Sequence, residues 1–556
     1  MTDRPLSADA PAASVADPLG RVEQTLRDAA LSLAGQTTLS GLRLERPPRP
    51  ELGDYSTNAA MLLAPALGSP QREAAERLGE VVEGELSGEV DRLEVAGPGF
   101  LNLFMSSAWY RRSLAGMAAA GDAYGRGGAE NRERTLVEFV SANPTGPITV
   151  ASGRHAAYGD SLCRILELAG HAVEREYYVN DHGTQVLLFG RSIGARARAE
   201  EPPEDGYRGP YVEELARRIE GAAEADPGEL SERGVELMVE GLRATLERFR
   251  VSFDRFFSER SLYETAAVER SLERLVERGH VYESEGAEWL RTTAFGDDKD
   301  RVIRRSTGEH TYFASDIAYH GHKLERRFDR AIDVLGADHH GYVGRLRAAW
   351  EALGGDPDRL EFQIMQLVNL LERGERAQMS KRKGEFVTLD DLIDDLGVDA
   401  ARFFLLQRSH DTTLDLDLAL AREQSQENPV YYAQYAHARI ASILRRAEEE
   451  GREITAPESL EASAEDLHPS ARSLVKRLLE LPSEVRTAAA RRAPHRFTTY
   501  AHEVAQELSA FYRDCRVLGA AEEGGDEGLR LAITSQAGRV IRLSLDLLGV
   551  SAPERM

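Results

Sequence analysis

Cysteine is almost absent from this chain of 556 residues, since only Cys163 and Cys515 occur. Two cysteines so far apart exclude a disulfide-stapled scaffold and favour a reducing compartment, the cytoplasm. Long apolar runs are also lacking, and no stretch approaches the roughly 20 residues that span a bilayer. Residues 1–20 have neither a basic leader nor an apolar core. They are therefore predicted to form a flexible tail rather than a signal peptide.

Positive charge is scarce as well. The chain has 69 basic and 93 acidic residues, and its formal net charge is −24. It lacks the basic coat of a nonspecific nucleic-acid binder, although a local basic groove stays compatible with this charge. Residues 421–556 hold 18 basic and 21 acidic residues, a net charge of −3, and repel a polyanion least. Only five basic residues are lysines, namely Lys299, Lys323, Lys381, Lys383 and Lys476.

The remaining composition, with 42% hydrophobic and 29% charged residues, is that of an ordinary folded protein. Its clearest unit is a β–α–β crossover: a buried strand at 136–140, a loop rich in Pro and Gly, a helix ending at Gly170, and a strand at 172–179. Loops at the carboxyl ends of such strands bind ligands in doubly wound sheets. Two more strands are predicted at 331–335 and 362–368.

The chain is long enough for several domains, and its patterns predict a multidomain α/β protein. Residues 21–125 predict a small α+β N-terminal domain. A second domain with a Rossmann-like parallel sheet is predicted over residues 130–390, interrupted at about 185–300 by a helical insertion. Residues 391–556 are almost entirely helical in pattern and predict an all-α bundle.

Two of the five lysines lie in one polar loop, Met379-Ser380-Lys381-Arg382-Lys383-Gly384, which follows the predicted strand at 362–368. Concentrated positive charge in a loop suits a polyphosphate, because the charge of a transferring phosphoryl group needs a cation beside it. The alternative interpretation is a solvated charge run.

A second segment, from Ser141 to His155, connects the first strand of the crossover to its helix. Helix N-termini present free N–H groups and the positive end of the helix dipole, and they bind phosphates. Thr149 and Ser152 add hydroxyl donors. The alternative is an ordinary strand-to-helix connection with a serine cap.

Together these segments resemble the HIGH region and the KMSKS loop of class I aminoacyl-tRNA synthetases, and the whole chain after the tail resembles the arginyl-tRNA synthetases. Further stretches match that family in the same order: Ala96-Gly97-Pro98-Gly99-Phe100, Tyr177-Tyr178-Val179-Asn180-Asp181, 428–440 and 552–556. Two places depart from it. Thr149-Val150-Ala151-Ser152 stands where the HIGH signature carries two histidines, and Gln378 replaces the first lysine of the loop signature.

The resemblance implies an arginine–tRNA ligase of the cytoplasm, a monomer that joins L-arginine to ATP and passes the arginyl group to the terminal adenosine of tRNA(Arg). It also implies that tRNA must bind before arginine is activated. Mg²⁺ would accompany the ATP. No dedicated protein metal site is expected, because Asp338-His339-His340 has no third ligand cluster at a useful spacing. The N-terminal domain would contact the tRNA elbow and the bundle the anticodon.

The resemblance also assigns residues to each task. Catalysis falls to Thr149, Ser152, His155, Lys381 and Arg382. ATP binding falls to Pro144, Gly146, Gly153, Gly336, His339, His340, Met379 and Ser380. Arginine binding falls to Glu138, Asn143, Tyr312, Asp316 and Asp338. Binding of tRNA falls to Phe100, Asn102, Tyr435 and Arg439.

Chemistry supports the arginine pocket independently. A guanidinium has five donors and pairs with carboxylates. Glu138 lies in an otherwise apolar strand, where an unpaired carboxylate is costly. Asp316 follows Tyr312 by four residues on a predicted helix, so both side chains face one side. The alternatives are a surface position for Asp316 and core packing for Phe100.

Two other functions stay open from the sequence. The altered HIGH positions fit a synthetase-like RNA-binding protein that no longer activates an amino acid. A class I synthetase for another amino acid is the second alternative. The cysteinyl enzymes are nearest in architecture, but they use zinc ligands that two distant cysteines do not supply.

Overall fold

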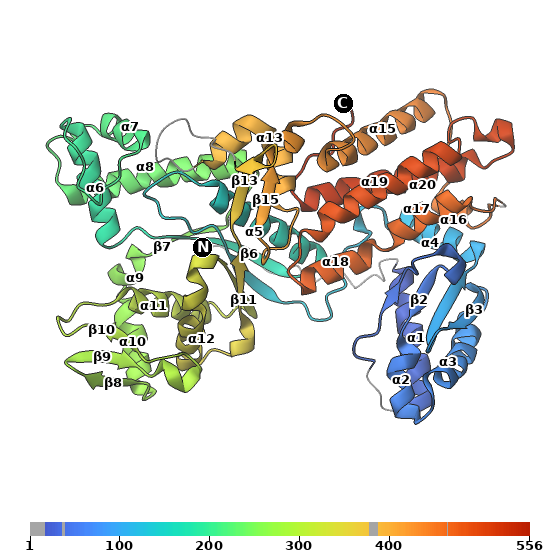
Figure 1. Cartoon of the computed structure of the whole chain (residues 1–556), viewed down its shortest axis with the longest axis horizontal. Coiled ribbons are helices and arrows are strands. Elements are labelled where there is room, and N and C mark those ends of the chain that lie inside the picture. The colour runs from blue at the N-terminus through green and yellow to red at the C-terminus, as the bar shows by residue number, and fades with distance from the viewer. Residues whose placement is uncertain (1–16, 36–38, 377–386, 464) are drawn as a thin grey trace.

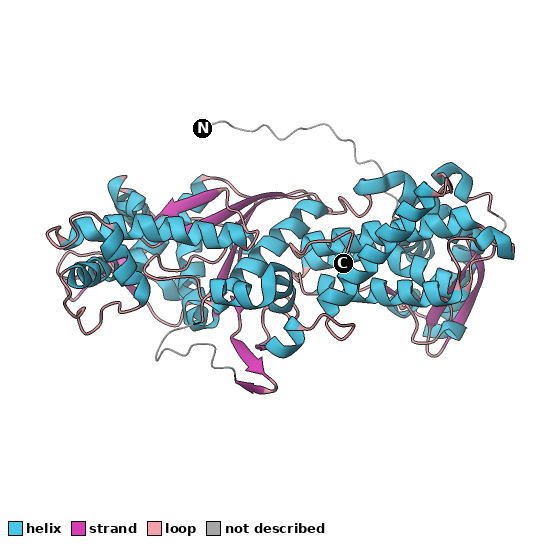
Figure 2. Cartoon of the chain, turned by 90° about the horizontal axis from the view of Figure 1, so that it is seen from above, coloured by secondary structure: helices cyan, strands magenta, loops and turns pink. Residues whose placement is uncertain are grey.

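The computed structural model describes residues 17–35, 39–376, 387–463 and 465–556. The molecule is elongated, with the N-terminal domain and the C-terminal helices at one end and the insertion of the catalytic domain at the other (Figure 1). Helices predominate throughout (Figure 2). Within the described residues, no helix is both long and apolar enough to cross a membrane.

The N-terminal domain is an antiparallel sheet of strand order β1-β2-β4-β3, covered by helices. Its elements are α1 (Pro18–Ala34), β1 (Leu44–Glu45), β2 (Tyr55–Thr57), α2 (Ala59–Leu67), α3 (Gln71–Glu85), β3 (Val90–Ala96), β4 (Phe100–Met105) and α4 (Ser107–Ala120). The predicted tail over 1–20 is too long, because Asp17 caps α1 by accepting a hydrogen bond from the Gly20 amide. Residues 1–16 lie outside the described part.

A five-stranded parallel sheet of order β12-β11-β5-β6-β7 forms the centre of the catalytic domain. Its elements include β5 (Arg134–Glu138), the crossover helix α5 (Val150–Ala169), β6 (Ala172–Val179), β11 (Arg330–Gly336) and β12 (Leu360–Met365). Gly170 ends α5 in a left-handed conformation, as its position predicts. The predicted strand at 362–368 is in fact two: β12 lies in this sheet, and β13 (Val368–Glu372) lies in another.

The first half of the segment 185–300 is helical throughout, with α6 (Thr184–Ala197), α7 (Pro210–Arg218) and α8 (Pro227–Arg248). Its second half contains β7 (Arg255–Ser258), α9 (Arg260–Glu264), α10 (Ala267–Glu277), β8 (Val281–Ser284) and β9 (Ala287–Leu290), and β10 (Arg301–Arg304) follows. β7 joins the parallel sheet, and β8–β10 form a sheet of their own. The prediction of an insertion made mostly of helices missed these strands, because strands of four residues show too little alternation to detect.

The remaining helices of the catalytic domain are α11 (Tyr312–Glu325) and α12 (Val343–Ala352). Beyond them, the all-helical prediction for 391–556 misses β15 (Leu414–Asp417), which pairs with β13 in a sheet that also holds β14 (Glu375–Arg376). The helices are α13 (Leu389–Leu405), α14 (Leu418–Arg422), α15 (Pro429–Glu449), α16 (Pro457–Leu460), α17 (Pro469–Leu479), α18 (Leu481–Ala490), α19 (Arg496–Asp514) and α20 (Glu527–Leu547). The predicted helical C-terminal domain is otherwise confirmed.

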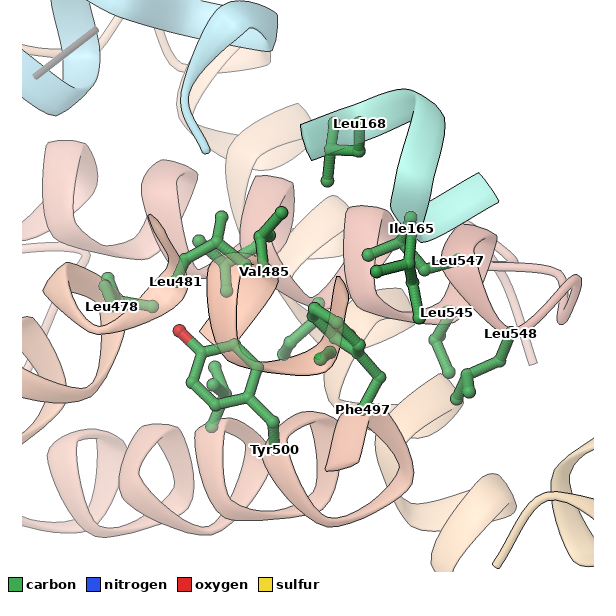
Figure 3. Close-up of a cluster of buried hydrophobic side chains, with 14 of the residues drawn as sticks. Ile165, Leu168, Leu478, Leu481, Val485, Phe497, Tyr500, Leu545, Leu547 and Leu548 are labelled. Atoms are coloured by element: carbon green, nitrogen blue, oxygen red, sulfur yellow. The ribbon is translucent and has the colours of Figure 1, made fainter. Parts of the chain in front are cut away.

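Catalytic domain and bundle share one hydrophobic core. Ile165 and Leu168 of α5 lie among apolar side chains of the bundle, as Figure 3 shows. The bundle residues labelled in this cluster are Leu478, Leu481, Val485, Phe497, Tyr500, Leu545, Leu547 and Leu548. A hydrogen bond also connects α5 to the bundle, since the Tyr158 hydroxyl donates to the Arg492 carbonyl at 2.7 Å. The crossover helix therefore belongs to both domains.

Candidate active site at the carboxyl ends of the parallel strands

Two buried carboxylates lie side by side in the centre of the parallel sheet. Glu138 of β5 pairs in register with Asp333 of β11, so the two side chains project from the same face. Lys323 of α11 covers that face. Its Nζ donates to Glu138 Oε2 at 2.6 Å and to Asp333 Oδ1 at 2.7 Å. One buried ammonium thus compensates two carboxylates that would otherwise repel each other.

The backbone turns sharply after Glu138. Val140 and Ser141 have φ angles of 68° and 38°, a region that non-glycine residues rarely adopt and that costs roughly 1–3 kcal/mol per residue. Ser141 Oγ donates to Glu138 Oε1 at 2.9 Å and accepts from the Tyr178 amide at 3.1 Å. These two hydrogen bonds stabilise the strained turn. Strained backbone of this kind is common at ligand-binding sites.

The helix α11 carries Tyr312 and Asp316 one turn apart, as predicted. The Tyr312 side chain is 60% exposed, and its hydroxyl lies 2.9 Å from Thr184 Oγ1. Asp316 is partly buried. Burial raises the pKa of Asp316 to about 6, Glu138 adds to the rise, and His320, Arg345 and Lys323 oppose it. A partly protonated carboxyl without an ion-pair partner among the described residues is suited to receive a cationic ligand.

The start of α5 is a second part of the site. Thr149 is the N-cap: its Oγ1 accepts from the Ser152 amide at 3.3 Å and lies 3.3 Å from Ser152 Oγ. The neighbouring backbone is joined to the segment at 387–389, since the Val150 amide donates to the Val387 carbonyl at 3.1 Å. Gly153 allows this approach, because an added Cβ would lie 2.7 Å from a methyl group of Leu389.

His155 lies one turn further along α5, beside the end of β11. Gly336 separates it from Asp338: a Cβ at Gly336 would lie 2.4 Å from Asp338 Oδ1 and 3.7 Å from His155 Cε1. Burial, with Arg154 nearby, lowers the pKa of His155 to about 4, so its imidazole is neutral at pH 7. Asp338 and His339, like His340, are exposed on the turn that follows β11.

The other residues predicted to bind arginine or ATP lie in the loop before α5 or outside the described part of the chain. Asn143 is exposed, Pro144 is buried and Gly146 is in contact with Tyr211. Met379, Ser380, Lys381 and Arg382 lie outside the described residues. In the described part of the chain, no three His, Cys, Asp or Glu side chains gather closely enough to hold a metal ion.

The residues predicted to bind tRNA differ in exposure. Phe100 is 40% exposed on β4, whereas Asn102 is buried and accepts a hydrogen bond from Ser56 Oγ at 2.7 Å. On the bundle, Tyr435 and Arg439 line a cavity of about 180 Å³. The other lining residues are Gln426, Tyr432, Ala436, Leu508, Ser509 and Tyr512. The Arg439 guanidinium lies over the Tyr512 ring at 4.8 Å.

Sequence reasoning missed Lys323 and Asp333. Asp333 shows the same signal as Glu138, a carboxylate inside an apolar strand, and that signal went unused there. Lys323 is a lysine in a chain that has only five. Glu259 was also missed: it is 4% exposed, and burial raises its pKa to about 7, with Asp316 among the charges nearby.

Comparison with known proteins matches the chain in three segments. The class I tRNA synthetase (R) catalytic domain matches residues 118–200 and 223–442. The arginyl-tRNA synthetase N-terminal domain matches 20–105, and the DALR anticodon-binding domain matches 433–556. The catalytic match continues past the boundary predicted at 390. Sheet, crossover and domain order thus define a class I aminoacyl-tRNA synthetase.

Whole-chain relatives narrow this to one family. An arginine–tRNA ligase of Bacillus licheniformis is 43% identical over 552 residues, 96% of this chain and 98% of that protein. One of Bacillus subtilis is 44% identical over 539 residues, 94% and 96% of the two chains. The structure of Thermus thermophilus arginyl-tRNA synthetase shares the fold, with a TM-score of 0.76 and 23% identity over 97% of this chain and 100% of that one. The chain belongs to the arginyl-tRNA synthetase family, which confirms the resemblance.

Proposed function

We propose that the protein is an arginine–tRNA ligase. It joins L-arginine to ATP, giving arginyl-adenylate and pyrophosphate, and then transfers the arginyl group to the 3′-terminal adenosine of tRNA(Arg). The observation that carries the proposal is the pair of neighbouring carboxyl groups, Glu138 and Asp316, in a chain 43% identical to an arginine–tRNA ligase along nearly its full length. A substrate with two cationic groups, the guanidinium and the α-ammonium, matches two carboxyl groups.

In this proposal the arginine lies between β5 and α11. Asp316 and Tyr312 hold the guanidinium, Glu138 receives the α-ammonium, and Asn143 and Asp338 contact the remaining polar groups. The raised pKa of Asp316 supports this assignment. Burial makes the charged carboxylate costly in the free protein, and a bound guanidinium would stabilise that charged form. Lysine would leave several of these acceptors unpaired, and sites of this kind reject such analogues by about four orders of magnitude.

ATP lies across the start of α5. Gly146, Gly153 and Pro144 shape the approach to the helix amides, and Gly336, His339 and His340 line the adenosine side. Ser152, His155 and the capped N-terminus donate to the phosphates, and the loop with Met379, Ser380, Lys381 and Arg382 supplies the positive charge that the missing histidines do not. Thr149 acts mainly through the cap, since its Oγ1 is already engaged by the Ser152 amide.

Magnesium would bind with the nucleotide, mainly through phosphate oxygens and water. The described residues fit that role and not a cage of protein ligands, because Asp338 is exposed at the mouth of the site and no three-ligand cluster occurs among them. The ion would neutralise phosphate charge.

The tRNA extends along one side of the molecule, from the elbow at the N-terminal domain to the anticodon at the bundle. Phe100 of β4 offers an exposed ring for stacking on a base. Asn102 of the same strand is buried and stabilises it through the hydrogen bond from Ser56 Oγ. Tyr435 and Arg439 offer a ring and a guanidinium at one cavity, which suits a splayed base. We place the enzyme in the cytoplasm as a monomer.

The test is aminoacylation with tRNA, ATP and each amino acid in radiolabelled form. Arginine alone should appear on tRNA(Arg). A wild-type protein that binds tRNA but charges no amino acid would identify the synthetase-like RNA-binding protein that the altered HIGH positions also fit. Charging with another amino acid would identify a different class I enzyme.

A further inference from the structure

The Lys323 side chain has no exposed surface, and it is the only cation within hydrogen-bonding distance of Glu138 among the described residues. It extends from α11 to the sheet and lies 4.3 Å from the centre of the Tyr319 ring. Asp333, the second partner of Lys323, has another contact, His320 Nε2 at 3.2 Å. Glu138 also accepts a hydrogen bond from the neutral Ser141 hydroxyl, so Lys323 is its one cationic partner among the described residues.

We infer that Lys323 is a positioning residue for arginine binding, which holds the Glu138 carboxylate toward the substrate and fixes α11 against β5. The inference deepens the proposed function and rests on it. Lys323 does not touch the arginine in this arrangement. It acts through Glu138 at one end of the pocket and, being seven residues after Asp316 on one helix face, supports the other end as well.

Charge balance gives the reason for a lysine here. Burial alone would lower the pKa of Lys323. The carboxylates of Asp333 and Glu138 outweigh this effect and raise the pKa above its ordinary value, so the ammonium stays charged. Burial alone would raise the pKa of Asp333, but Lys323 and His320 lower it instead. With the lysine present, two buried carboxylates and one ammonium leave one negative charge for the α-ammonium of arginine.

Stability alone does not explain this cluster. Buried ion pairs are often no more stabilising than apolar side chains of the same volume, because desolvation offsets the attraction. A lysine between a glutamate and an aspartate in the sheet core therefore indicates a need for charge at that point. The strained turn at Val140 and Ser141, which adds the Ser141 hydrogen bond to Glu138, indicates the same need.

The experiment measures arginine KM, ATP KM and the urea midpoint of three variants. Lys323→Met removes the ammonium group and keeps a side chain of similar volume. Lys323→Met/Asp333→Asn removes the ammonium together with its second partner. Arg402→Met is the matched control: Arg402 is also fully buried and donates to Asp160 at 2.6 Å and to the Leu548 carbonyl at 2.7 Å, away from the pocket.

We expect Lys323→Met to raise arginine KM by about tenfold or more and to leave ATP KM within about twofold. The double variant should recover the urea midpoint of the wild type but keep the raised arginine KM. Arg402→Met should lower the urea midpoint and leave both KM values unchanged.

An arginine KM within about twofold of wild type in Lys323→Met would overturn the inference. So would a double variant that recovers arginine KM along with its midpoint, since Lys323 would then only compensate Asp333. If Lys323→Met does not fold, the double variant decides. Failure of the proposed function would appear in the wild type, as absence of arginyl-tRNA, and is therefore distinct.

Discussion

Asp316 is the residue whose protonation should depend most directly on substrate. A carboxyl whose pKa rises from 3.8 to about 6 on folding stabilises the free protein at acid pH, and that contribution is lost as pH rises through about 6. A bound guanidinium favours the carboxylate and reverses the shift. Arginine binding should therefore release a proton below about pH 6, and affinity should increase with pH until about pH 7 and then level.

Calorimetry with saturating tRNA, from about pH 5 to about pH 8, checks this first prediction. The groups that face Asp316 are Glu138, Arg345, Lys323, His320, Glu259 and Tyr178. Asp316→Asn should bind arginine at least about tenfold more weakly and lose the pH dependence, because the amide neither ionises nor pairs with charge. Equal affinity at all pH values in the wild type would place Asp316 outside the pocket.

Lys381 and Ser152 should act on the transition state of adenylation. Loss of one donor to a developing phosphate charge commonly costs about 3 kcal/mol, roughly a hundredfold in rate. We expect Ser152→Ala to approach that loss and Lys381→Ala to reach or exceed it, with arginine affinity little changed. Single-turnover adenylation with saturating tRNA measures the rate. Lys299→Ala, at an exposed lysine of the insertion, is the control and should be neutral; equal losses of affinity and rate would refute the assignment.

At the scale of the element, α5 depends on its first turn. Thr149→Ala removes the N-cap and should cost about 1 kcal/mol of stability, whereas Thr149→Ser keeps the hydroxyl and should not. The rate of adenylation should fall when the cap is lost, since the cap orders the helix amides that are proposed to bind ATP. Ser106→Ala is the matched control, because Ser106 caps α4 through the Trp109 amide at 3.1 Å. It should cost similar stability and leave adenylation unchanged; a loss of adenylation in both variants would contradict the assignment.

Elements differ in how far sequence predicts them, for physical reasons. β5 and β11 are buried on both faces and are therefore continuous apolar runs, which made the parallel sheet predictable. β7 and β10 hold four residues each, two of them arginine in β10, and such edges carry no period. The alternative of a serine cap at the start of α5 named the wrong residue, since the cap is Thr149. The contact between Val150 and Val387 joins residues more than two hundred positions apart, so the sequence does not show it. The pairing of Glu138 with Lys323 is hidden for the same reason.

At the scale of the whole molecule, adenylation should require tRNA. The 20 residues of α5 extend about 30 Å, from the proposed phosphate-binding end of the site to the bundle that would hold the anticodon. A tRNA seated on the bundle can therefore influence the start of this helix. We expect negligible ATP–pyrophosphate exchange without RNA and rapid exchange with tRNA(Arg), while a tRNA of another specificity serves as control. Rapid exchange in RNA-free protein would refute this order.

The core that α5 shares with the bundle also limits how the protein can be divided. A truncated chain ending near residue 442 contains the matched catalytic domain, yet it would strip Ile165 and Leu168 of their apolar neighbours (Figure 3). The bared helix face would promote aggregation of such a fragment. The isolated bundle would expose Leu481 and Leu545 in the same way. Fragment complementation, in which both halves are produced together, is therefore the practical route to studying either half.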